Sequence, residues 1–134
     1  MTWYFWNPET DELRPMKYKF QSSPMHLWEA ELVDHVKHME KVRRVAETHV
    51  KAAWISTIFL GLDHAWNGGT PVLFETMIFD LSFKRRRYDD FQVRYTSSAE
   101  ARENHERVSR LCKWLLLKAP QVSYRNFGEI LGKL

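Results

Sequence analysis

Five side chains of the types that enzymes use for proton transfer and ion binding are spread over residues 63–105: Asp63, His64, Glu75, Arg94 and His105. Together they supply acid, base and cation, which is enough for a small hydrolase or a metal-assisted enzyme with His64 or His105 as general base and Glu75 as its partner. The chain has no Ser-x-Gly elbow, HExxH or paired-carboxylate motif. We therefore favour binding over catalysis, expect no cofactor and no metal, and keep the enzyme as the alternative.

His105 belongs to an apolar stripe with helical spacing, so its ring should point into the protein. A buried imidazole needs hydrogen-bond partners. Two interpretations follow. His105 is a core histidine paired with a carbonyl or carboxylate, or it contacts a ligand.

Glu75 lies inside an apolar run, Leu73 to Phe79, that is typical of a strand. Alternation places it on one face with Met77, while Thr76 lies on the other. If the face of Glu75 is covered, its carboxylate needs a His, an Arg or a ligand beside it. If that face is open, Glu75 is solvated.

The segment from Asp63 to Gly69 contains a glycine-rich turn between two apolar runs. Glycines there could turn backbone amides toward an anion, but the segment has neither a GxGxxG pattern nor a Walker lysine. A hairpin turn capped by Asp63 is the simpler interpretation. The predicted ligand-binding set combines this turn with the residues above: Asp63, His64, Trp66, Asn67, Gly68, Gly69, Glu75, Arg94 and His105.

The elements that must position these residues centre on residues 54–80, two apolar runs that read as paired strands. Residues 45–50 alternate with period two and can pair with the strand at 54–62. Residues 1–22 suggest an irregular hairpin or an edge strand, because Pro15 cannot donate to a central ladder. Residues 81–92, with the basic run Lys84, Arg85, Arg86 and Arg87, suggest an exposed loop that could contact nucleic acid.

Two helices are expected to back this sheet. Ser23 and Pro24 mark the start of a helix over 23–42, with an apolar stripe made by Met25, Trp28, Leu32, Val36 and Met39. The three histidines of that helix are expected to be solvated. Ser97 and Glu100 have capping-box spacing and open a second helix over 97–118.

We therefore predict an α+β fold in which a three- to four-stranded antiparallel sheet packs against two helices. One domain spans residues 1–120, and residues 121–134 form a C-terminal tail. The formal charge is +3, from 20 basic and 17 acidic residues, so no broad field of one sign is expected. The single cysteine, Cys112, favours a reducing compartment, and no apolar run is long enough for a membrane span.

The sequence also resembles a known family. Ile55 to His64 reads ISTIFLGLDH, Pro71 to Phe79 reads PVLFETMIF, and Arg94-Tyr95 precedes Glu100-Ala101 and His105. These strings resemble a widespread family of small uncharacterised phage and prophage proteins over about residues 43–108. The turn at 67–71 and the long segment 84–92 depart from that family's pattern.

The resemblance implies a phage origin and a location in the cytoplasm of the host bacterium, but no activity. The predicted function is therefore a small phage-encoded binding protein for host takeover or evasion of defence. It would sequester a small anionic or nucleotide-like ligand, or inhibit a host protein, and it could form a homo-oligomer. Alternatives are the small hydrolase described above and a virion or assembly component.

Overall fold

The computed structural model describes residues 2–80 and 91–117, and it has an α+β fold. The elements follow the order β1 (Tyr4–Trp6), β2 (Leu13–Pro15), α1 (Met25–Val42), β3 (Arg44–Val50), β4 (Ala53–Phe59), β5 (Phe74–Asp80), β6 (Gln92–Tyr95) and α2 (Ser98–Leu117). The predicted fold class is confirmed. The predicted tail lies outside the described residues.

The central sheet is antiparallel throughout, with strand order β3-β4-β5-β6. The predicted pairing of β3 with β4 is confirmed, and Lys51 makes their tight turn with a left-handed backbone (φ 52°). Strand β6 was not predicted, although Val93 and Tyr95 alternate with polar Gln92 and Arg94. Apart from Phe91 and Gln92, the predicted 81–92 loop, including its basic run, lies outside the described residues.

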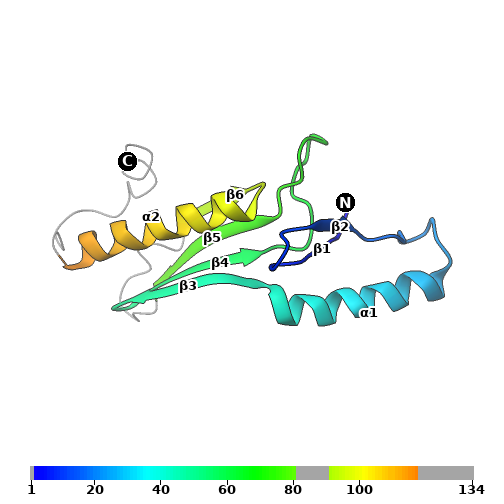
Figure 1. The fold of residues 1–134 in the computed structure, drawn as a ribbon, viewed down its shortest axis with the longest axis horizontal. Coiled ribbons are helices and arrows are strands. Elements are labelled where there is room, and N and C mark those ends of the chain that lie inside the picture. Colours follow the sequence, from blue (N-terminus) through cyan, green and yellow to red (C-terminus); the bar gives the residue numbers. More distant parts are fainter. Residues whose placement is uncertain (1, 81–90, 118–134) are drawn as a thin grey trace.

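Helix α2 lies across one face of this sheet (Figure 1). The predicted cap forms, because the Ser97 hydroxyl accepts a hydrogen bond from the Glu100 N–H at 3.2 Å. The predicted stripe of α2 is buried, and Val108, Cys112 and Leu115 pack on Ile55 and Ile78 of the sheet. Burial raises the pKa of the Cys112 thiol to about 12.

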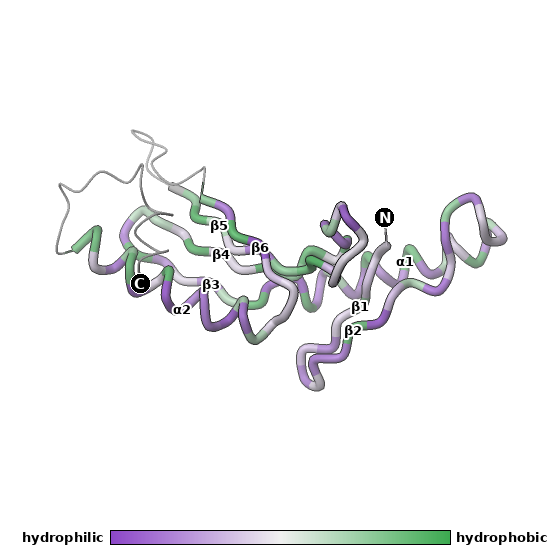
Figure 2. The backbone as a smooth tube through the Cα atoms, turned by 90° about the horizontal axis from the view of Figure 1, so that it is seen from above, coloured by the Kyte–Doolittle hydropathy of each residue, from purple (hydrophilic) through white to green (hydrophobic). Residues whose placement is uncertain are grey.

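Helix α1 does not lie on the sheet. It extends beyond the end of the sheet beside the β1-β2 hairpin, and Met39 and Val42 in its last turns reach the core around Phe59 and Phe74 (Figures 1 and 2). Only α2 therefore backs the sheet as expected. The start of α1 also differs, because the Ser23 hydroxyl accepts from the Lys19 N–H and makes no cap bond.

Two of the three α1 histidines are structural, so the prediction that all are solvated was wrong. His35 is buried, and its Nε2 lies 2.9 Å from the Tyr4 carbonyl oxygen. His38 Nε2 accepts a hydrogen bond from the Trp6 N–H at 3.0 Å. Burial lowers the pKa of His38, as that neutral acceptor role requires. Both histidines fasten β1 to α1, whereas His26 is exposed.

The hairpin is also joined to α2. Asp11, in the turn between β1 and β2, accepts hydrogen bonds from the Trp6 indole N–H at 2.8 Å and from the Ser98 hydroxyl. The bond from Ser98, and then that from Trp6, lower the pKa of Asp11. Trp6 is buried against Phe59 and Phe74, so the hairpin closes one end of the core.

Candidate functional site

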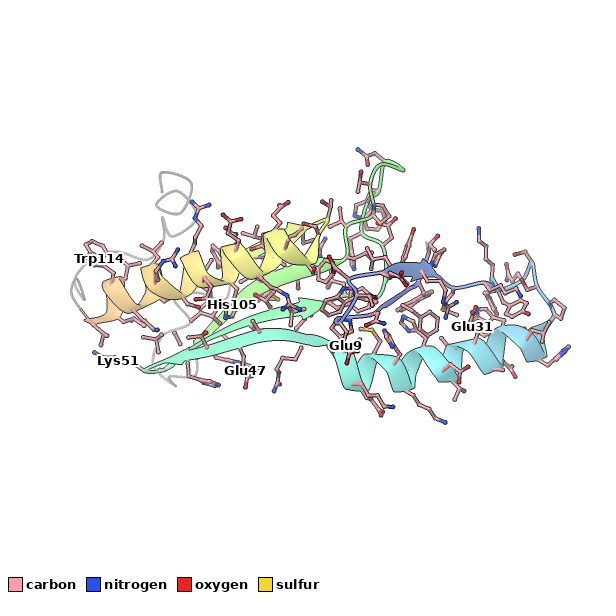
Figure 3. The ribbon with its side chains drawn as sticks, in the orientation of Figure 1. Glu9, Glu31, Glu47, Lys51, His105 and Trp114 are labelled. Carbon is pink, nitrogen blue, oxygen red and sulfur yellow. The ribbon has the colours of Figure 1, made fainter. Side chains whose placement is uncertain are left out.

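His105 lies between α2 and the sheet, where two strands hold it (Figure 3). Its Nε2 is 2.9 Å from the Thr48 hydroxyl on β3, and its Nδ1 is 2.7 Å from the Thr57 hydroxyl on β4. The side chain is 1% exposed, and both ring nitrogens are hydrogen-bonded. Of the two interpretations of the sequence, this supports the core histidine, although its partners are hydroxyls rather than a carbonyl or carboxylate.

The contacts of His105 continue across the sheet as a chain of hydroxyls. Thr57 and Thr76 share a hydrogen bond of 2.6 Å, Thr76 bonds the Tyr95 hydroxyl, and Asn104 Nδ2 donates to Tyr95 at 2.7 Å. Burial is the main cause of a lowered pKa at His105 and of a raised pKa at Tyr95, so burial favours the uncharged forms of both. This chain of side chains is called the inner network below.

Glu75 points to the opposite face of the sheet. It is 5% exposed, and Arg94, its cross-strand neighbour on β6, donates from Nε to its carboxylate at 2.9 Å. The Gln92 amide donates to the same oxygen. The arginine that burial would require beside this carboxylate is therefore present.

His105 and Glu75 cannot act together. Thr76 bonds within the inner network, and Glu75, the next residue on the same strand, faces away from it. The idea that the imidazole of α2 meets this carboxylate was wrong, because a sheet separates them. Within residues 2–80 and 91–117, no three His, Cys, Asp or Glu side chains gather closely enough to hold a metal ion.

The segment between β4 and β5 is a braced loop. Asp63 Oδ1 accepts hydrogen bonds from the N–H groups of Ala65 at 2.8 Å and Val72 at 2.9 Å, and the His64 N–H donates to the Val72 carbonyl at 3.0 Å. Asp63 thus closes the base of the loop, as in the simpler interpretation of the sequence. Trp66 is 81% exposed beyond this base.

The tip of this loop is a local turn. The Asn67 side-chain oxygen accepts from the Gly69 N–H at 3.4 Å, and Gly68 has a left-handed backbone (φ 72°) that glycine adopts readily. The predicted ligand-binding residues therefore fall into three places. Residues 63–69 form the loop, Glu75 and Arg94 lie on the face of the sheet away from α2, and His105 lies on the side of α2 that faces the sheet.

The outer face of the sheet carries a group of residues that the sequence interpretation missed. No helix among the described residues covers this face, on which Trp54 of β4 lies between His49 of β3 and Phe79 of β5. The rings of His49 and Trp54 are stacked, with centroids 6.0 Å apart and planes 7° apart, and Phe79 is 5.1 Å from Trp54. This row of rings is called the aromatic row. The alternation of side chains along β4 and β5 was the feature of the sequence that could have placed Trp54 and Phe79 on one face.

A second row of side chains crosses the same face at Ile58, four residues after Trp54 on β4. Neighbouring strands pair its members in the order Arg44, Ile58, Glu75 and Arg94, so an arginine lies at each end, and it is called the arginine row. Arg44 is also 3.2 Å from Glu47 through its Nε. At the rise of a strand, about 13 Å separates this arginine row from the aromatic row.

A scan against models of protein families finds no match to this chain, and searches of curated proteins and of solved structures find none either. No helix that the structure describes has the length and apolar character needed to cross a membrane.

Proposed function

We propose that this protein is a small phage-encoded binding protein that acts without catalysis in the host cytoplasm, where it sequesters a nucleotide-like ligand on the outer face of its sheet. The phage origin and the location rest on the motif resemblance alone. The class of ligand is inferred from the aromatic row and the arginine row beside it.

The aromatic row suits a planar ring. Bases stack on aromatic side chains of open sheets, and each stacked base contributes about 1–3 kcal/mol. Trp54 is half-buried, with its ring held between those of His49 and Phe79, so part of its surface stays accessible. A base on Trp54 would direct its phosphates along the strands toward Arg44 and Arg94.

The inner network supports binding rather than turnover. A general base must have a nitrogen within reach of substrate, and both nitrogens of His105 are bonded to threonine hydroxyls, that of buried Thr57 and that of half-buried Thr48. Glu75 is likewise paired with Arg94. The groups suited to proton transfer therefore stabilise the fold.

Isothermal titration with ATP, GTP and cyclic dinucleotides tests this proposal. The Trp54→Thr variant keeps a strand-forming residue and removes the ring, so it should weaken binding by about five- to 150-fold, which is the value of one stacked base. The matched control is Trp66→Ala, which removes an exposed tryptophan elsewhere and should bind normally. Absence of binding to all these ligands, or equal binding by both variants, would refute the proposal.

Inhibition of a host protein is the second candidate, and Trp66 favours it. An exposed tryptophan on a braced loop can enter a partner's pocket with little loss of conformational freedom, and such residues often dominate interfaces. A tagged protein expressed in infected cells should then co-purify one host protein. Trp66→Ala should lose that protein and Trp54→Thr should keep it, whereas retention by Trp66→Ala would exclude this surface.

A further inference from the structure

Helix α1 has little tertiary packing for its length. Of its 18 residues only His35 is buried, while Met25, Val33 and Val36 are 49%, 52% and 52% exposed. Protein helices owe most of their stability to burial of an apolar face. An extended helix with three half-exposed apolar side chains is therefore incomplete without further contacts.

The exposed side chains form one strip. At 100° per residue, Met25, Val33, Val36 and the partly buried Leu32 fall within an arc of about 100°. Glu31 contacts the hairpin through Arg14 and the Tyr18 N–H, and it lies outside that arc (Figure 3). The strip therefore flanks the side that the hairpin occupies and remains accessible.

Charge changes sign along the same helix. Residues 25–34 carry Glu29, Glu31 and Asp34 without Lys or Arg, a formal charge of −3. Residues 35–43, which end at the C-cap Arg43, carry three basic residues, Lys37, Lys41 and Arg43, against Glu40, a formal charge of +2. Two such helices repel when they lie parallel and attract when antiparallel, because each acidic half then faces a basic half.

We propose that α1 joins two copies of this chain into an antiparallel homodimer with two-fold symmetry. In such a pair the same strip serves both copies, and the axis passes the middle of the helix, next to Val33. The sheet lies at one end of α1, as Figures 1 and 2 show, so the two sheets lie at opposite ends of the pair and do not collide. The proposed dimer through α1 does not depend on the proposed nucleotide site on the sheet.

Sedimentation velocity from low to high micromolar concentration tests the dimer. The unmodified protein should dimerise, and Val33→Glu, which places two like charges at the axis, should weaken association at least ten-fold. The matched control is Trp114→Glu, which puts the same charge at another half-exposed apolar residue, on α2, and should leave the dimer intact. A monomer at every concentration would overturn the proposal, and so would equal dissociation of the two variants.

Disulfide crosslinking tests the orientation. Val33→Cys lies at the axis and should link two copies under mild oxidation, whereas the two Met25→Cys positions lie at opposite ends and should not link. Buried Cys112, with its raised pKa, should not interfere. Efficient linking through Met25→Cys would show a parallel pair and overturn the antiparallel arrangement. Folding of each variant is checked by circular dichroism.

Discussion

The two faces of the central sheet treat polar side chains in opposite ways. On the inner face, α2 covers the threonines and contributes His105, and these side chains bond one another. On the outer face, Glu75 and Arg94 also pair, but rings and guanidinium groups remain accessible around them. The difference teaches that a residue type suited to chemistry is not a site in itself, because burial decides whether its polar atoms are committed to the fold.

The largest expected effect comes from the inner face. His105→Ala should lower the free energy of unfolding by about 3 kcal/mol, because it leaves a cavity and removes the partner of Thr48 and Thr57. Urea unfolding followed by circular dichroism measures this. The control is Ser109→Ala, one turn along α2, whose buried hydroxyl has no hydrogen-bond partner among the described residues and whose loss should be nearly neutral.

The inner face should also make stability depend on pH. The folded pKa of His105 lies below the ordinary 6.5, so the unfolded chain takes up a proton that the folded chain resists. The contribution of neutral His105 to the free energy of unfolding is complete above pH 6.5. It is lost as the pH falls below that value, and this group lowers the free energy of unfolding by at most about 1.4 kcal/mol per pH unit.

Urea unfolding at intervals between pH 8 and pH 5 measures that slope. His38 has a lowered pKa too, and the His38→Gln variant removes its contribution while keeping a hydrogen-bond acceptor. If the free energy of unfolding of this variant stays constant as the pH is lowered from 6.5 to 5, the fold does not hold His105 neutral.

Removal of a polar side chain from the outer face should cost less stability than removal of His105 from the inner face. Glu75→Ala is expected to cost about 1.5 kcal/mol in urea unfolding, because Arg94 is 38% exposed and can turn toward water when its partner is lost. A cost equal to that of His105→Ala would mean that the two faces do not differ in this respect.

The smallest effect is expected at the aromatic row. Trp54→Thr should change the free energy of unfolding by less than about 1 kcal/mol, because the ring is only half-buried and threonine suits a strand. A loss of nucleotide binding without a loss of stability would sharpen the contrast between the faces. A large loss of stability would return Trp54 to a structural role.

The sequence by itself determined the elements formed by short-range physics. The Ser97 cap, the buried stripe of α2 and the alternation of β3 and β4 each follow from residues a few positions apart. Asp63 at the base of its loop was likewise readable from turn chemistry. Local hydrogen bonding and the periods of helix and strand are sufficient for these.

The tertiary structure decided which of these elements meet. The apolar stripe of α1 predicts a buried face but does not say what covers it. The hairpin packs on α1 beside that stripe, at His35, whereas Met25 and Val36 of the stripe stay about half exposed. Glu75 and Thr76 differ by one position, and only the placement of α2 determines that Thr76 faces His105 while Glu75 faces Arg94. Such pairings depend on contacts between residues far apart in the chain, which no local spacing encodes.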